Sequence, residues 1–225
     1  MPAFVTHELF GAQVFAFLDE EIQELLERNP APYFWGQQGP DLLFFKDALL
    51  GTSLLPRYGN LMHLKKVDEL FACMSRYLNE RRHTDEYETL ASYILGFAGH
   101  YCLDCEAHPY IYFKQMQKEL VLDRSGCLVR LTEAGEALLG GKKIFSPHIR
   151  RKQVMEDILN LDCDSWYHLN TPEKTDNRSF PKIFYAAAYR AVDMLERIYF
   201  CSQDGVPYEP HGLLSFDNGS PASMV

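Results

Sequence analysis

The chain of 225 residues is predicted to fold as an all-α, multi-helix bundle. Two observations support this fold class: apolar residues recur at helical spacing in long segments, and Pro, Gly, Ser and Asn mark where these segments begin and end. A hydrophobic content of 47% and a charged content of 24% are those of an ordinary globular protein. We therefore expect one all-α domain over residues 1–202, followed by a loosely ordered tail over residues 203–225.

The first two helices are predicted from apolar spacing and from capping residues. Residues 7–28 carry apolar side chains at helical spacing, which stops before an Asn-Pro-Ala-Pro stretch. Asp41 follows Gly39-Pro40 and precedes an apolar run, which is the usual place of an N-cap residue. A second helix is therefore expected to begin at Asp41.

The middle of the chain predicts two longer helices. Residues 61–82 have the pattern of an amphipathic helix, whereas residues 85–108 are apolar nearly all round. The latter segment is therefore expected to be a central, buried helix. Pro109 disfavours helical geometry at His108, so this helix is expected to end or bend there.

The C-terminal half is predicted to add two further helices. Ser146 and Pro147 have the pattern of an N-cap followed by the first helical residue, and the last helix is expected over residues 180–200. Residues 121–131 have the pattern of a short hairpin, and residues 162–179 are expected to form a polar loop.

Composition restricts the classes of partner. The net charge of −9 argues against a nucleic acid or an anionic membrane surface, but not against a small anionic substrate held by metal ions. No apolar run is long enough to span a bilayer, and the first residues lack the features of a signal peptide. The six cysteines are too sparse for a disulfide scaffold, so we expect reduced thiols in a cytoplasmic protein.

The clearest chemical signal lies in the predicted buried helix. Asp104 and His108 follow His100 at intervals of four residues, which places them at roughly 40° and 80° from it around a helix. Apolar residues share this flank, so the three side chains are expected to point into the protein. Either a bound divalent metal ion or a His–Asp hydrogen-bond network satisfies such a buried carboxylate, and for this triplet alone the network is the simpler interpretation.

Four further residues of metal-ligand type occupy similar positions. His7 and Asp41 open the first two predicted helices, His63 lies within residues 61–82, and His148 follows Pro147. Together with the triplet they predict a metal cluster, which no single one of them would do. The other histidines lie in charged or polar segments and are not assigned to the cluster: His83, His168 and His211.

A rival metal site is the Cys-x2-Cys pair in the same segment. Cys102 and Cys105 project at roughly 200° and 140° from His100 around the helix. No second pair of this kind exists in the sequence to complete a four-thiolate site. We therefore interpret both cysteines as buried structural thiols.

The ordered motifs of the chain resemble those of the zinc-dependent phospholipase C family, most closely its small bacterial branch without a signal peptide. These motifs are HELFG (7–11), GPDLLFF (39–45), Met62-His63, GHYCLDCEAHPYI (99–111) and PHIRRK (147–152). The resemblance covers about residues 3–160. It implies an all-α fold with up to three zinc ions between the helices, an architecture shared with single-strand nucleases, and cleavage of phosphodiester bonds in phospholipids.

Carried over by position, the resemblance implies a ligand set. Asp41, His63 and His100 would hold one metal ion, and Asp104 would bridge it to a second ion that His7 also holds. Water activated by the metal ions would attack phosphorus, and Asp41 or Asp104 could accept the proton of that water.

The third ion is implied to lie between His108 and His148, and here the chain departs from the family pattern. The family completes this site with a glutamate four residues after the second histidine, where this chain has Lys152. The family also uses an N-terminal tryptophan as a ligand, whereas this chain begins with Met1-Pro2.

Lys152→Glu is expected to raise zinc affinity or stoichiometry, because a cationic side chain one helical turn from His148 repels a metal ion. Glu156, two turns from His148, is the other candidate ligand. Zinc titrations of the wild type, Lys152→Glu and Glu156→Ala check this. Metal loss in Glu156→Ala alone would identify Glu156 as the ligand, and no change in either variant would place both residues away from the metal.

Three functions are consistent with the sequence, and the first is preferred. It is a metal-dependent phosphodiester hydrolase, similar to phospholipase C, with a small-molecule or lipid phosphate ester as substrate. The second is a phosphohydrolase of nucleotides or small phosphate esters on the same fold. The third is a non-catalytic metal-binding helical protein with a degenerate cluster.

Overall fold

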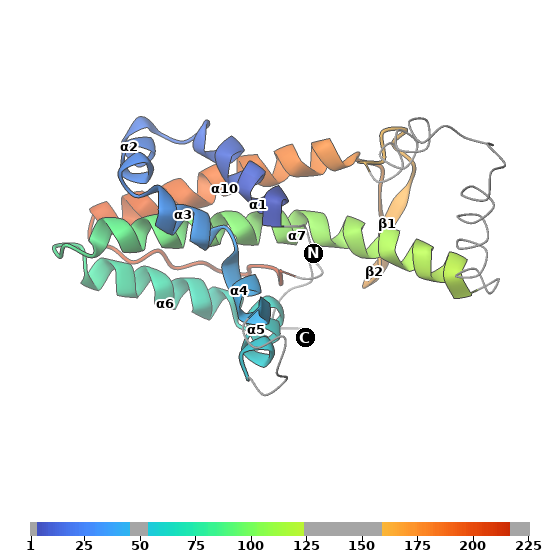
Figure 1. Ribbon diagram of the computed structural model, residues 1–225, viewed down its shortest axis with the longest axis horizontal. Helices are drawn as coiled ribbons and strands as arrows, with labels where there is room; N and C mark the ends of the chain where they lie inside the picture. The colour runs from blue at the N-terminus through green and yellow to red at the C-terminus, as the bar shows by residue number, and fades with distance from the viewer. Residues whose placement is uncertain (1–3, 46–53, 124–158, 217–225) are drawn as a thin grey trace, which may run out of the picture. The chain divides into compact units, whose positions relative to one another are not determined.

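The computed structural model describes residues 4–45, 54–123 and 159–216. Within them the regular secondary structure is helical apart from one two-stranded sheet, which confirms the all-α class (Figure 1). None of the described helices is long and apolar enough to cross a membrane. The chain divides into two compact units, which we call unit 1 (Met1–His108 with Phe184–Val225) and unit 2 (Pro109–Ile183).

Unit 1 holds most of the described helices. Two of them, α7 and α10, continue into unit 2. The described elements of unit 1 are α1 (Phe4–Phe15), α2 (Glu20–Arg28), α3 (Pro30–Gly36), the 3-10 helix η1 (Gly39–Asp41), α4 (Leu42–Phe45), α5 (Leu55–Leu64), α6 (Val67–Glu80), the first part of α7 (Tyr87–Asp123) and most of α10 (Phe180–Gln203).

The helix predicted over residues 7–28 is two helices, because Asp19 starts a new one. The Asp19 backbone is extended and its Oδ1 accepts a hydrogen bond of 3.0 Å from the Glu21 N–H, which makes it the N-cap of α2. The Asn-Pro-Ala-Pro stretch does end α2 as predicted, but it then begins α3 with Pro30 as its first residue. Asp41 lies in η1, directly before the short helix α4.

The helix predicted over residues 61–82 is also interrupted. α5 ends at Leu64, Lys65 is extended, and Lys66 adopts a left-handed conformation with φ of 60° before α6 begins at Val67. Lysine has no preference for this conformation, so the break carries no sequence signal of the kind that glycine gives.

The buried helix was predicted to end or bend at His108, and it does not end there. α7 runs from Tyr87 to Asp123 with Pro109 in its interior. Proline removes one helical hydrogen bond and costs about 3 kcal/mol in a helix interior. The flank around it is buried, and the packing of that flank outweighs the local cost. The boundary between units 1 and 2 falls at this proline.

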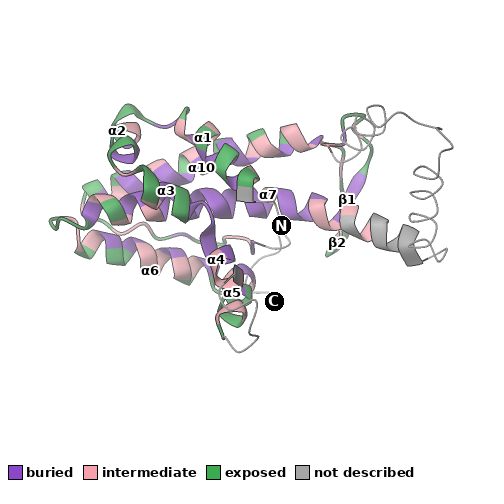
Figure 2. Ribbon diagram, in the orientation of Figure 1, coloured by how far each residue is buried: buried purple, intermediate pink, exposed green. Residues whose placement is uncertain are grey.

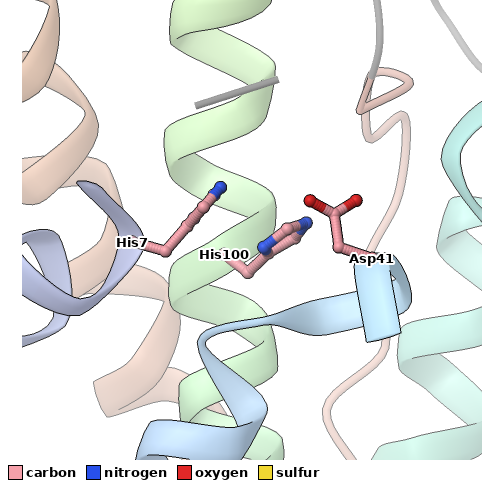
Figure 3. A group of neighbouring side chains, drawn as sticks. All are labelled: His7, Asp41 and His100. Carbon is pink, nitrogen blue, oxygen red and sulfur yellow. The ribbon is translucent and has the colours of Figure 1, made fainter. Parts of the chain in front are cut away.

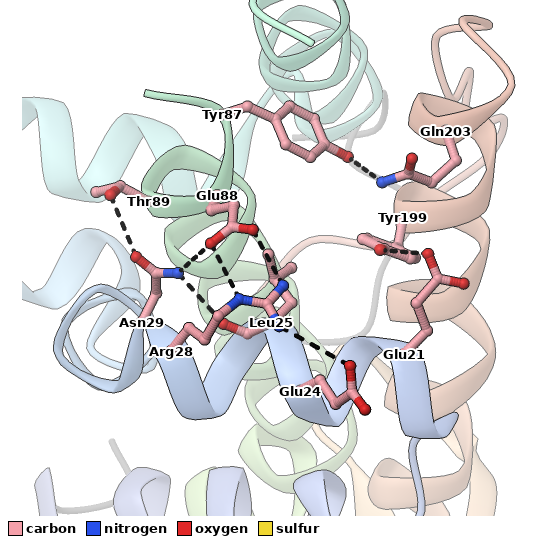
Figure 4. Close-up of polar contacts among 10 residues, drawn as sticks. All are labelled: Glu21, Glu24, Leu25, Arg28, Asn29, Tyr87, Glu88, Thr89, Tyr199 and Gln203. Carbon is pink, nitrogen blue, oxygen red and sulfur yellow. Dashed lines mark hydrogen bonds and ion pairs between the residues drawn. The ribbon is translucent and has the colours of Figure 1, made fainter. Parts of the chain in front are cut away.

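The centre of unit 1 is the buried part of α7. Figure 2 shows this stretch of α7 in the colour of buried residues, and Leu95, Ala98, Tyr101 and Leu103 have no exposed surface. Polar contacts tie the ends of the neighbouring helices together (Figure 4). Among them, Arg28 pairs with Glu88 at 3.0 Å, which holds α2 on α7.

Glycines set the distance between α3 and α7. A Cβ on Gly36 would overlap the carbonyl oxygen of Tyr93, and a Cβ on Gly96 would overlap that of Tyr33. The two backbones are therefore in direct contact, which only glycine permits at both positions. This contact brings the end of α3 against the part of α7 that carries His100.

In unit 2 the predicted polar loop over residues 162–179 contains an antiparallel hairpin. Its strands are β1 (Trp166–His168) and β2 (Thr171–Asp176), with Trp166 opposite Asp176. The Trp166 side chain is buried and its ring packs on Tyr110, which explains why this polar stretch is ordered. Of the hairpin predicted over residues 121–131, residues 121–123 belong to α7 and the others lie outside the described residues.

The predicted loose tail differs from the structure over its first part. Residues 206–216, which we call the C-terminal segment, follow α10 and lie along α6 and α7 (Figure 1). Tyr208 N–H donates to Ser75 Oγ, and Phe216 is completely buried. The segment is thus held by specific contacts, and residues 217–225 lie outside the described residues.

Candidate metal centre

The structure brings six of the seven predicted ligand residues together in unit 1. They come from α1, η1, α5 and α7, and none has more than 5% of its whole-residue surface exposed. Figure 3 shows the ring of His100 between His7 and Asp41. His148 lies outside the described residues, as do Lys152 and Glu156. We call the six residues the His/Asp cluster: His7, Asp41, His63, His100, Asp104 and His108.

Asp104 is the centre of this cluster, and four imidazoles converge on its carboxylate. Its Oδ2 lies 2.9 Å from His100 Nε2 and 3.7 Å from His63 Nε2. Its Oδ1 lies 3.2 Å from His108 Nε2 and 3.3 Å from His7 Nε2. Each oxygen therefore faces two imidazole nitrogens. The second carboxylate of the cluster belongs to Asp41.

The Asp41 carboxylate extends the cluster on the Oδ2 side of Asp104. Its Oδ1 lies 3.2 Å from His63 Nε2. Asp41, His7 and His100 also have one ligand atom each within 4.8 Å of one another, as do His63, His100 and Asp104. Two overlapping groups of three potential ligands thus share His100.

Backbone carbonyls fix the orientation of three of the imidazoles. His63 Nδ1 lies 2.8 Å from the Gly59 oxygen, and His108 Nδ1 lies 2.7 Å from the Phe216 oxygen. His100 Nδ1 lies 3.1 Å from the Gln37 oxygen. A carbonyl oxygen only accepts, so each Nδ1 carries the proton and donates it. In a neutral ring Nε2 then presents its lone pair to the cluster, which is the tautomer that a metal-binding histidine needs.

This arrangement leaves acceptors facing acceptors. With the ring protons on Nδ1, neither oxygen of Asp104 nor the Nε2 of His100 has a hydrogen-bond partner within the described residues, and neither ring nitrogen of His7 has one. A lone pair on nitrogen repels a carboxylate oxygen at about 3 Å unless a positive charge lies between them. Protons on all four rings would supply that charge, but would bury four cations around two carboxylates.

The electrostatics of the site favour a neutral imidazole at His7 and an ionised Asp104. Burial lowers the pKa of His7, and the adjacent His100 ring, stacked at 4.2 Å between centroids, lowers it further. Burial raises the pKa of Asp104, but positive charge at His100 and His108 outweighs that effect and holds it well below its usual range. With the rings neutral, a bound metal ion would supply that charge. A neutral histidine and an ionised aspartate are the protonation states in which both residues bind metals.

The spacing of the potential ligand atoms fits a divalent metal ion. Zinc binds imidazole nitrogen and carboxylate oxygen at about 2.0–2.2 Å with tetrahedral geometry, so its ligand atoms lie about 3.3–3.6 Å apart. The nitrogen–oxygen distances around Asp104 range from 2.9 Å to 3.7 Å. A metal ion would also satisfy the facing lone pairs. The residues present therefore fit the group that the sequence implied.

Gly39 keeps the space beside His100 open. Its φ is +49°, a left-handed conformation that glycine adopts readily, and a Cβ there would overlap the His100 ring. The Gln37 oxygen that accepts from His100 is two residues away. The stretch Gly36–Gly39 thus sets both the ring orientation and the room around it. Sequence reasoning found Gly39-Pro40 only as the flank of Asp41.

The other residues considered in the sequence lie away from the cluster. Cys102 and Cys105 are buried as predicted, and burial raises the pKa of Cys102 to about 12, so it is a protonated, inert thiol. Trp35 is 56% exposed and lines a surface cavity of about 700 Å³ with Tyr77 and Tyr93. The three unassigned histidines contribute no atom to the cluster within the described residues.

No family model matches the chain, and no curated protein or solved structure matches it either. The functional interpretation therefore depends on the geometry of the cluster and on the motifs of the sequence.

Proposed function

We propose that the chain is a zinc-dependent phosphodiester hydrolase of the phospholipase C type, acting on a phospholipid-like substrate at the His/Asp cluster. The observation that carries the proposal is the buried carboxylate of Asp104, with the Nε2 atoms of four histidines 2.9–3.7 Å from its oxygens. The resemblance of the sequence motifs to the zinc-dependent phospholipases C supplies the reaction class and the substrate.

The cluster would hold at least two ions, one on each oxygen of Asp104. His63 and His100 lie at Oδ2, with Asp41 beside His63. His7 and His108 lie at Oδ1. A ligand set rich in imidazole, with carboxylates, favours zinc over magnesium or calcium, which prefer sites made of oxygen alone.

Bound zinc ions would supply Lewis acidity toward a phosphoryl oxygen and a lowered pKa for a coordinated water molecule. The chain's own residues would do the rest. Asp104 holds the cluster together and is fully buried, so it is a poor proton acceptor from substrate water. The Asp41 side chain is 7% exposed and lies at the edge of the cluster, so it is the better candidate for that role.

Two measurements on the purified full chain test the proposal. Elemental analysis after zinc incubation is expected to give two or more zinc ions per chain, because the carboxylate of Asp104 has two separate pairs of histidines. Hydrolysis is then measured with phospholipid, bis-ester and mono-ester substrates, with and without a chelator.

The outcomes separate the three functions. Chelator-sensitive cleavage of phospholipid supports the proposal, whereas cleavage of nucleotides or mono-esters alone would identify a phosphohydrolase of small esters. Zinc binding without hydrolysis of any substrate would identify a non-catalytic metal-binding protein. A wild-type chain that takes up no transition metal would exclude all three.

A further inference from the structure

The last described residue, Phe216, lies inside the core of unit 1 and against the cluster. Its side chain is completely buried, with ring centroids 4.8 Å from Tyr101 and 5.3 Å from His63. It also contacts the ring of His100 at 6.0 Å between centroids. An aromatic side chain in these contacts anchors the end of the C-terminal segment beside the metal ligands.

The backbone of the same residue bonds to two elements that carry ligands. The Phe216 N–H donates to the His63 carbonyl oxygen in α5 at 2.9 Å. The Phe216 carbonyl oxygen accepts from His108 Nδ1 in α7 at 2.7 Å. The backbone of one residue at the end of the C-terminal segment therefore links α5 to α7 and fixes the tautomer of a ligand histidine.

Earlier in the C-terminal segment, hydrogen bonds to a side chain of α6 hold the segment in place. The carboxylate of Asp68 accepts hydrogen bonds from the N–H groups of Gly212 at 2.7 Å and Leu213 at 2.9 Å. Such bonds to an ionised acceptor are stronger than those between neutral groups. Gly212 has φ of +72°, so the tight geometry at this anchor also depends on glycine. Asp68 itself is outside the His/Asp cluster.

We infer that the C-terminal segment is a positioning element of the metal centre, and that its docking on α6 and metal binding stabilise each other. The inference rests on the proposed function only in that the cluster binds metal. A metal ion on His108 Nε2 requires the Nδ1–H tautomer, and the carbonyl oxygen of docked Phe216 accepts the hydrogen bond from that N–H. Whatever favours docking therefore raises metal affinity, and by thermodynamic linkage metal binding favours docking by the same factor.

The test is a zinc titration of the full chain carrying Asp68→Ala, with Glu69→Ala as the matched control. Both residues are acidic side chains in the first turn of α6, so both substitutions remove the same interaction with the helix dipole. Of the two, only Asp68 has hydrogen bonds to the C-terminal segment within the described residues. We expect Asp68→Ala to weaken zinc binding about tenfold, in the range seen when outer partners of metal ligands are lost, and Glu69→Ala to leave it unchanged.

Hydrogen exchange of the Phe216 amide gives a readout that overall stability does not determine. In wild type, zinc is expected to slow this exchange relative to chelated protein, and Asp68→Ala is expected to speed it in both forms. Gly212→Ala, which strains the segment without touching α6, should reproduce both effects.

The coupling would be overturned if Asp68→Ala and Gly212→Ala bound zinc as tightly as wild type and hydrogen exchange at Phe216 were unchanged. This result would not affect the proposal that the cluster binds metal. Absence of zinc binding in wild type would overturn both the coupling and the proposed function. Zinc binding that depends on the C-terminal segment, without hydrolysis of any ester, would support the coupling and reject only the catalytic proposal.

Discussion

Asp104→Asn is expected to abolish zinc binding at the cluster. The carboxylate is the shared partner of four imidazoles, two on each oxygen, so its replacement removes a ligand from both ion positions. Wild type should gain about 4 kcal/mol of stability in zinc at a thousand times the dissociation constant, and the variant close to none. Elemental analysis and thermal unfolding with zinc or a chelator measure both effects.

The same variant separates a metal site from a His–Asp hydrogen-bond network. If the network held the cluster, removal of its central charge would destabilise the protein by about 3–5 kcal/mol, with or without metal. If a metal ion holds it, the chelated protein has lone pairs that face each other, and the asparagine NH2 can donate to them. Stability in chelator should then be unchanged or higher in Asp104→Asn.

Two controls and one companion variant complete this test. His63→Ala is expected to reduce zinc content, because His63 lies beside both carboxylates of the cluster. His168→Ala, in β1 of unit 2, and Asp193→Asn, on the exposed face of α10, should keep wild-type zinc content. Equal zinc content in all four variants would reject the assignment of the cluster.

The grouping of the side chains could be predicted because it depends on residue type and helical spacing. The spacing of four residues places His100, Asp104 and His108 on one flank of any helix, and an apolar flank points inward. His7, Asp41 and His63 come from separate helices. Only the resemblance of the ordered motifs to the zinc-dependent phospholipases C indicated that these three side chains lie near the triplet.

The groups that orient the imidazoles could not be predicted from the sequence. They are the backbone carbonyls of Gly59, Gln37 and Phe216, and every residue type carries a carbonyl. Phe216 follows a segment rich in Gly and Pro, which is typical of a loose tail. Its burial depends on contacts with α6 and α7 that only the folded chain brings together.

The helix boundaries show the same division between local and tertiary causes. Asp19 has the residue type of an N-cap, so the break between α1 and α2 carries a local signal that the longer apolar pattern masked. Lys66 and Pro109 are opposite cases. Lys66 separates two helices although lysine is not a typical helix-breaking residue, whereas Pro109 does not break α7. At both positions tertiary packing outweighs the local preference of the residue.

Gly96→Ala is expected to destabilise unit 1 strongly, although alanine is the better helix former. In an exposed helix interior this change would stabilise the protein by about 1 kcal/mol. Here the added Cβ would overlap the Tyr33 carbonyl oxygen and lie 3.0 Å from the Gly36 Cα, and backbone atoms cannot rotate away. α3 must move off α7, so we expect a net loss of at least about 2–3 kcal/mol, measured by denaturant unfolding in chelator.

The matched control is Gly59→Ala in α5, where the nearest atoms belong to the end of the Phe44 ring at 2.9 Å and a side chain can yield. The free energy of unfolding of Gly59→Ala should stay within about 1 kcal/mol of wild type. Gly96→Ala is also expected to act at the cluster, because displacement of α3 carries the Gln37 carbonyl away from His100 Nδ1. Gly96→Ala should therefore bind zinc more weakly even where it is still folded.

A Gly96→Ala chain as stable as wild type would show that α3 and α7 are not in backbone contact, and that the His100 ring is oriented by something other than this helix crossing.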